Sequence, residues 1–162
     1  RVGHRWVADQ AGPADATAWV FTPDHIRDQL HHLCTAVEYR HAAGFMTTRQ
    51  PSDSAVLEII KMSDLCWFTL STSANFRYGQ PHLVESEADL IYTLAGLTRR
   101  FNLNWNALDV YLSGQWPLDS SWISSLQDRT PRIHWRNTPW SSLNTELPAH
   151  WFTPLYDLFE CA

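Results

Sequence analysis

The chain has 162 residues, of which 44% are hydrophobic, 13% are aromatic and 18% are charged. This composition excludes an intrinsically disordered chain, and the length is close to the commonest size of one domain. We therefore expect a single globular domain over residues 1–162. The net charge of −5 excludes a general attraction to the phosphate backbone of nucleic acids, so any contact with DNA or RNA has to be local.

The cysteines and the apolar runs bear on the compartment. Cys34, Cys66 and Cys161 cannot all pair within the chain, and none lies in a Cys-x-x-Cys motif, so reduced thiols are the simplest account. No apolar run approaches the roughly 18 residues of a membrane span, and the first residues lack the zones of a signal peptide. We expect a cytoplasmic protein that does not contact a membrane.

The first part of the chain predicts two short strands and a helix. Apolar pieces at Arg5 to Ala8 and at Ala18 to Phe21 could be strands. Thr22-Pro23-Asp24 is typical of a helix start, because the threonine can cap, the proline fits the first position and the aspartate complements the dipole. Apolar residues follow at helical spacing and Gly44 supplies a left-handed stop, which predicts a helix over about 23–43.

The middle of the chain mixes predicted helices with one hairpin. Asp53 can cap a helix whose apolar residues are Val56, Leu57, Ile60 and Met62. The run from Leu65 to Thr72 alternates with the period of a half-buried strand, and a hairpin with residues 76–78 is possible. Ser86 opens a capping box, so a helix is expected from there to about residue 101, and a short helix should follow over Trp105 to Leu112.

The last third changes in composition. Beyond Gly114, five tryptophans lie among five prolines and many serines, which we interpret as an irregular, ordered coat over the core. Thr153-Pro154 predicts a closing helix. Together these elements predict a mainly α protein with a small β element (α+β): a compact helical core in one domain, with an irregular Trp/Pro-rich C-terminal third.

One segment, from Leu97 to Gly114, carries a resemblance. It is similar to the two-helix core of repressor-type helix-turn-helix proteins, with Asn102 at the turn usually given to glycine. The buried positions would be Phe101, Leu103, Leu108, Tyr111 and Leu112. The resemblance implies that Asn104, Trp105, Asn106 and Asp109 face the major groove of DNA, with Arg99 and Arg100 near phosphates. The alternative is a purely structural helical corner.

Signals of catalysis or of a cofactor are weak. His31, Cys34, Glu38 and His41 share one side of the predicted first helix, but a helix spreads such a set over about 15 Å, so we expect no metal site. The chain has six glycines and none of the common nucleophile, phosphate-binding or zinc-binding motifs. Cys66 with His82 or His134 is a possible catalytic pair. We expect a protein that is not an enzyme and has no cofactor.

Arginine and tryptophan gather near the C-terminus. Arg132, Trp135, Arg136 and Trp140 lie close in sequence, and these residue types are enriched where proteins bind one another. Six or seven of the nine tryptophans are expected to fill or cover the core. We interpret the chain as a non-catalytic protein-binding module, such as an adaptor, an inhibitor or immunity-type protein, or an accessory subunit. A helix-turn-helix DNA-binding protein is the alternative.

Overall fold

The computed structural model describes residues 4–9, 18–33, 54–72, 75–116, 121–138 and 147–160. The chain divides into two compact units, residues 1–49 and residues 50–162, and each is described by itself. No helix in the described part of the chain is long and apolar enough to cross a membrane.

The first unit contains a hairpin and a helix. Strand β1 (His4–Asp9) pairs with β2 (Ala18–Pro23) in antiparallel register, and α1 (Asp24–Leu33) follows directly. These elements confirm the two strands and the helix start predicted at Thr22-Pro23-Asp24. The remainder of the predicted helix, residues 34–43, lies outside the described residues.

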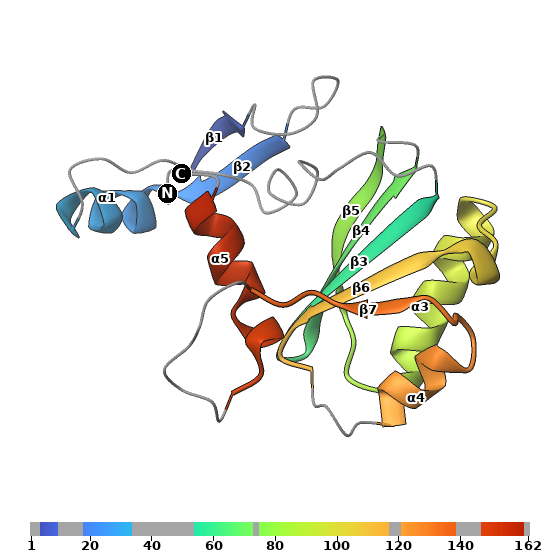
Figure 1. Cartoon of the computed structure of the whole chain (residues 1–162). Helices are drawn as coiled ribbons and strands as arrows, with labels where there is room; N and C mark the ends of the chain where they lie inside the picture. Colours follow the sequence, from blue (N-terminus) through green and yellow to red (C-terminus); the bar gives the residue numbers. More distant parts are fainter. Residues whose placement is uncertain are drawn as a thin grey trace. The chain divides into compact units, whose positions relative to one another are not determined.

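The second unit is built on one mixed sheet of five strands in the order β5-β4-β3-β6-β7 (Figure 1). The strands are β3 (Ala55–Met62), β4 (Leu65–Thr72), β5 (Asn75–Leu83), β6 (Asp109–Gly114) and β7 (Ile133–Trp135). Strands β3, β4 and β5 form an antiparallel meander, whereas β6 runs parallel to β3 and β7 runs parallel to β6. β4 has the bounds of the strand predicted over residues 65–72. It pairs with β5, which confirms the predicted hairpin with residues 76–78.

Two helices supply the crossovers that parallel strands require. α3 (Glu87–Arg100) leads from β5 to β6 and α4 (Ser121–Gln127) leads from β6 to β7, and both lie on the same side of the sheet (Figure 1). The predicted capping box at the start of α3 is confirmed, because Ser86 accepts from the Asp89 amide while the Asp89 carboxylate accepts from the Ser86 amide. The core between sheet and helices contains Leu57, Ile59, Phe68, Leu70, Leu90, Leu94, Val110, Leu112, Ile123 and Leu126.

The predicted fold class is wrong, because the unit is dominated by its sheet and is not mainly α. The helix predicted after Asp53 is strand β3, at the centre of the sheet. Leu57 and Ile59 are buried on one face, and Glu58 and Ile60 are buried on the other. A strand covered on both faces loses the alternation that marks a half-buried strand, so its apolar spacing was mistaken for that of a helix.

The helix-turn-helix prediction is also wrong. After α3, Asn102 does adopt the expected left-handed conformation, with φ of 51°. A short 3-10 helix, η1 (Trp105–Ala107), comes next, and β6 follows where the recognition helix was predicted. Pairing with β3 on one side and β7 on the other decides this conformation, because local helical preference is weak against tertiary contacts.

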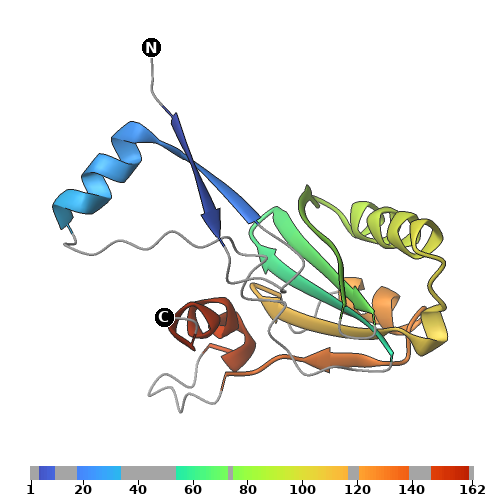
Figure 2. The ribbon, with the colours of Figure 1, turned by 90° about the horizontal axis from the view of Figure 1, so that it is seen from above.

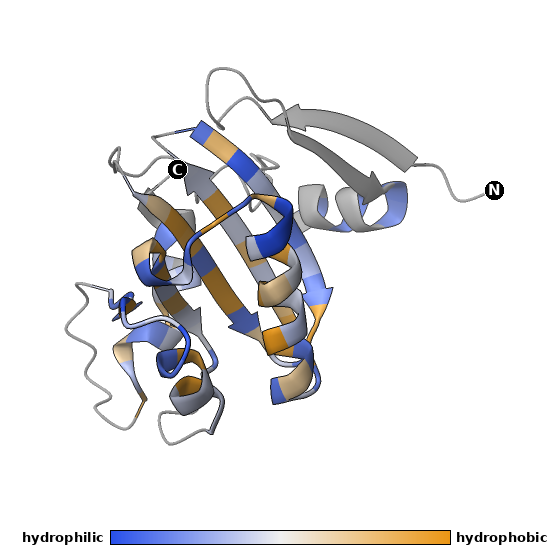
Figure 3. Cartoon of the chain, turned by 90° about the vertical axis from the view of Figure 1, so that its right-hand side faces the viewer, coloured by the Kyte–Doolittle hydropathy of each residue, from blue (hydrophilic) through white to orange (hydrophobic). Residues whose placement is uncertain are grey.

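The C-terminal third is more regular than predicted. It contains α4 and β7, followed by a second 3-10 helix, η2 (Ala149–Trp151), and by α5 (Thr153–Glu160), which confirms the closing helix. β7 is the edge strand of the sheet, as Figure 2 shows. Hydrophobic and hydrophilic bands along the strands are visible in Figure 3.

Candidate functional site

Alternation along β7 sorts its side chains between the two faces of the sheet. Ile133 and Trp135 pack against the core that α3 and α4 cover. Arg132, which directly precedes the strand, shares the opposite face with His134 and Arg136. The side chains of Arg132 and His134 are 46% and 45% exposed, whereas that of Arg136 is 19% exposed. The open part of this face therefore carries one arginine and one histidine.

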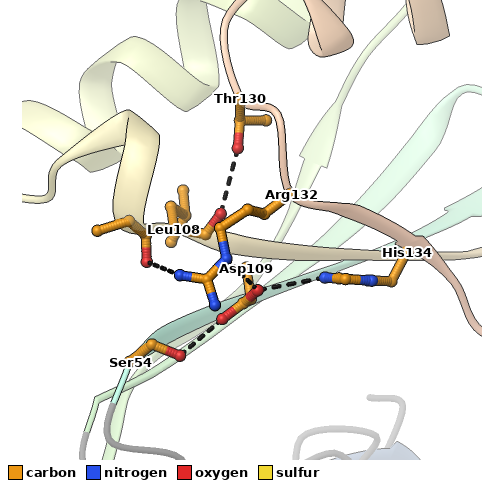
Figure 4. Close-up of polar contacts among 7 residues, drawn as sticks. Ser54, Leu108, Asp109, Thr130, Arg132 and His134 are labelled. Atoms are coloured by element: carbon orange, nitrogen blue, oxygen red, sulfur yellow. Dashed lines mark hydrogen bonds and ion pairs between the residues drawn. The ribbon is translucent and has the colours of Figure 1, made fainter.

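A single carboxylate, that of Asp109, holds the residues of this open face together (Figure 4). Arg132 Nε donates to Asp109 Oδ1 at 2.9 Å, and His134 Nε2 lies 3.2 Å from the same oxygen. Ser54 Oγ, just before β3, donates to Asp109 Oδ2 at 2.6 Å. The strand register brings these residues together. Asp109 lies opposite Val56 of β3, and Val110, the next residue of β6, lies opposite Ile133 of β7.

The backbone around Asp109 is fixed from two further sides. Thr130 Oγ1 donates to the Leu108 carbonyl at 3.2 Å, and Arg132 Nη1 lies 3.5 Å from the Ala107 carbonyl. His134 stacks on Tyr111, with ring centroids 4.8 Å apart. The arginine and the imidazole are thus exposed to solvent and at the same time held in one orientation.

The environment of Asp109 keeps its carboxylate ionised. Burial by itself raises the pKa of this carboxyl, but hydrogen bonds from Ser54 and His134 and the positive charge of Arg132 outweigh it, so the pKa lies below its ordinary value. Three donors occupy the two oxygens, which leaves little acceptor capacity for a substrate. Asp109 therefore orients its neighbours and is poorly suited to take up a proton itself.

Ser54, Asp109 and His134 have the residue types of a hydrolase triad without its geometry. In such a triad the imidazole lies between the hydroxyl and the carboxylate and removes the hydroxyl proton. Here the Ser54 hydroxyl donates directly to the carboxylate, and the imidazole binds the other oxygen. The arrangement does not activate Ser54 as a nucleophile.

The residues predicted to bind a partner are separated by the structure. Arg136 Nη2 donates to Asp157 Oδ1 of α5 at 2.5 Å, and Arg136 Nη1 lies 3.1 Å from Glu58 Oε1. Trp135 faces the core side, with its ring 4.3 Å from that of His150. Both residues hold elements of the fold together, while Arg132 remains on the open face. Trp140 lies outside the described residues.

The residues predicted to contact DNA do not form a recognition surface of the expected kind. Arg99 and Arg100 end α3, and the Arg100 guanidinium lies over the rings of Tyr78 and Phe101. Asn104 caps η1 by accepting from the Asn106 amide, and Trp105 packs against the core. We do not propose DNA binding, because the recognition helix on which that interpretation depended is a strand.

The structure supports neither a catalytic role for Cys66 nor a metal site within the described residues. Cys66 and His82 are register partners on β4 and β5, but Cys66 is fully buried and burial raises the pKa of its thiol to about 11, so the thiolate is scarce. Of the four residues considered for a metal, Cys34, Glu38 and His41 lie outside the described residues. Within the described ranges, no three metal-ligand side chains come together.

The sequence interpretation did not bring this site together: it did not name Ser54, it placed Tyr111 among buried positions, and it considered His134 only as a partner for Cys66. A signal was present, since Arg132-Ile-His-Trp-Arg136 alternates between polar and apolar residues with the period of a strand. The surrounding prolines and tryptophans drew attention to irregular structure instead. The pairing of residues 54, 109 and 134, which are distant in sequence, follows from the sheet order alone.

Substituting Asp109→Asn should change the pH dependence of stability. Because folding lowers the pKa of this carboxyl, its ionised form stabilises the fold above a pH of about 4, and this contribution is lost as the pH falls further. The difference in the free energy of unfolding between wild type and variant should therefore be large near neutral pH and narrow at about pH 3. Urea titrations at both pH values test this, with the exposed Asp128→Asn as control. An equal difference at both would contradict the role of Asp109.

Comparisons with known proteins bear on the fold. No protein-family description and no curated protein matches the chain. A solved structure from Bacteroides thetaiotaomicron, described as a protein with actin-like ATPase fold and unknown function, is similar with a TM-score of 0.79 and 11% identity. The alignment covers 100% of the present chain and 61% of that protein. This likeness agrees with the observed sheet, conflicts with a mainly α or helix-turn-helix protein, and shows a shared fold alone.

Proposed function

We propose that the chain is a non-catalytic protein-binding module that uses the outer face of β7. We call this surface the β7 face and define it by Tyr111, Arg132 and His134. The observation that carries the proposal is that Arg132 and His134 are nearly half exposed and yet fixed by the Asp109 carboxylate. Binding to such a surface costs little side-chain entropy, which is a property of good binding sites.

The chemistry of the β7 face suits a protein partner. Arg132 uses two of its nitrogens on Asp109 and Ala107, and its planar group has five N–H donors in all, so donors remain for a carboxylate or a carbonyl. The His134 ring, stacked on Tyr111, adds a flat surface beside it. Arginine and aromatic rings of this kind are enriched in protein interfaces.

The proposal is narrower than the sequence prediction. Arg136 and Trp135 belong to the supporting structure, because one is bound by two acidic side chains and the other packs on the core. The arrangement of Ser54, Asp109 and His134 supports a non-catalytic role. The carboxylate lies between the hydroxyl and the imidazole, so the imidazole does not activate the hydroxyl.

The test is a quantitative capture experiment with the full chain as bait in a lysate of its own organism. The variants are Arg132→Gln and His134→Ala, and the control is Arg99→Ala, which removes an exposed arginine at the end of α3. We expect a protein retained by wild type and by the control but reduced at least about tenfold by either variant, the effect of losing roughly 1.4 kcal/mol. Retention that is the same for all four chains would make the proposal wrong.

A further inference from the structure

The end of the sheet farthest from Asp109 exposes large hydrophobic side chains on three neighbouring strands. Met62 at the end of β3 lies opposite Leu65 at the start of β4, and Leu65 lies opposite Leu83 at the end of β5. Residues directly opposed in this way share one face of the sheet. We call these three residues the apolar row.

All three side chains of the apolar row are exposed to solvent, and they are neighbours on the sheet. The exposed fractions are 43% for Met62, 38% for Leu65 and 64% for Leu83. Trp67 and Pro81, which are register partners on β4 and β5, continue the same face toward the middle of the sheet. Contiguous apolar surface of this kind marks interaction sites in soluble proteins.

The backbone beneath the row is held rigidly. The turn between β3 and β4 consists of Ser63 and Asp64. Lys61 Nζ donates to the Ser63 carbonyl at 2.5 Å, and the Ser63 amide donates to Gln115 Oε1 at 3.0 Å. The Val84 amide donates to the Asp64 carbonyl at 2.7 Å. The row is therefore preorganised and does not need to be ordered when a partner binds.

Charges at the border of the row select the partner. Asp64 lies in the turn and Glu85 lies two residues after Leu83. Both are exposed, and neither carboxylate makes a hydrogen bond or an ion pair with a described residue. Lys61, the residue before Met62, donates to the Ser63 carbonyl and lies over the Trp122 ring, 4.7 Å from its centroid. The border is thus acidic, in a chain whose net charge is −5.

We propose that the apolar row binds a segment of a partner protein in which apolar side chains are flanked by lysine or arginine. Apolar side chains of the partner cover Met62, Leu65 and Leu83, and its cations pair with Asp64 and Glu85. A second copy of this chain would place like charges against one another, and the same repulsion opposes an anionic membrane surface. This surface is separate from the β7 face and does not depend on the function proposed for it.

The experiment uses fluorescein-labelled peptides and the full chain, with binding followed by anisotropy at low and physiological salt. The probe is a short peptide in which leucine alternates with lysine, and the comparison peptides replace lysine by glutamate or leucine by serine. We expect the leucine–lysine peptide to bind best, with affinity that falls as salt rises. Leu83→Ser should weaken binding at least about tenfold, since burial of a leucine side chain is worth about 1.5–3 kcal/mol.

Two further variants separate the apolar from the charge contribution. Tyr92→Ser removes another exposed hydrophobic residue, 82% exposed on α3, and should leave binding unchanged. The double variant Asp64→Asn with Glu85→Gln should lower the affinity and reduce its dependence on salt. Equal binding by Leu83→Ser and wild type would overturn the proposal, as would equal binding of the leucine–glutamate peptide. Self-association of the wild type that Leu83→Ser abolishes would overturn it in favour of a second copy.

Discussion

Gly114→Ala should cost about 3 kcal/mol or more in the free energy of unfolding. Gly114 ends β6 with φ of 84°, in the left-handed region that residues with a Cβ disfavour by about 1–2 kcal/mol. An added Cβ would lie 2.2 Å from the Lys61 carbonyl oxygen, which is backbone and already accepts from the Gln115 amide. Since Lys61 and Gly114 are register partners, relieving this clash has to push β3 and β6 apart at the centre of the sheet.

The matched control is Gly96→Ala. Gly96 is an exposed residue of α3, and an added Cβ there meets no atom within 4 Å. Alanine is the better helix former, so this variant should gain about 0.5–1 kcal/mol. Urea unfolding of both variants measures the two changes. A loss below about 1 kcal/mol for Gly114→Ala would show that the β3–β6 contact is looser than the structure indicates.

Arg136→Met should be the other strongly destabilising change. Its guanidinium binds the carboxylates of Glu58 and Asp157, which are 3% and 8% exposed, and so joins β7 to the central strand and to α5. Removing one partner of a buried ion pair takes away much of the charge that balances the other, which typically costs 3–5 kcal/mol. With Arg136 partly exposed, we expect a loss of about 3 kcal/mol.

The control for this change is Arg129→Met, which removes an exposed arginine in the turn after α4. Surface charges of this kind contribute about 0–1 kcal/mol, so the unfolding midpoint should hardly move. Adding Glu58→Gln and Asp157→Asn to Arg136→Met should recover part of the loss, because these two buried side chains then carry no negative charge for Arg136 to balance. Equal losses of unfolding free energy for Arg136→Met and Arg129→Met, in thermal or urea unfolding, would show that the ion pairs of Arg136 do not hold α5 to the sheet.

Several elements were predictable because their signals are local. The capping box at Ser86 identifies the start of α3 through contacts between residues three apart. The alternation over 65–72 identifies β4 because only one of the two faces of this strand is fully buried. The left-handed conformation of Asn102 is a preference of that side chain. The closing helix at Thr153-Pro154 follows from the same kind of information.

The rest was decided by contacts between distant residues. β3 and β6 have apolar spacing that fits a helix, and each becomes a strand because its backbone pairs with strands on both sides. The same pairing divides the residues that were predicted to bind a partner between the two faces of the sheet. Trp135 packs on the core side, and the Arg136 guanidinium binds the carboxylates of Glu58 and Asp157.

By itself, the sequence determined the composition of a folded chain, the charge, and those turns, caps and strands whose causes lie within a few residues. Tertiary structure alone decided that the protein is built on a mixed sheet, that Ser54, Asp109 and His134 meet, and that Met62, Leu65 and Leu83 form one surface. The physical reason is that strand pairing satisfies backbone hydrogen bonds across long sequence separations, and no local preference specifies which strand the partner is.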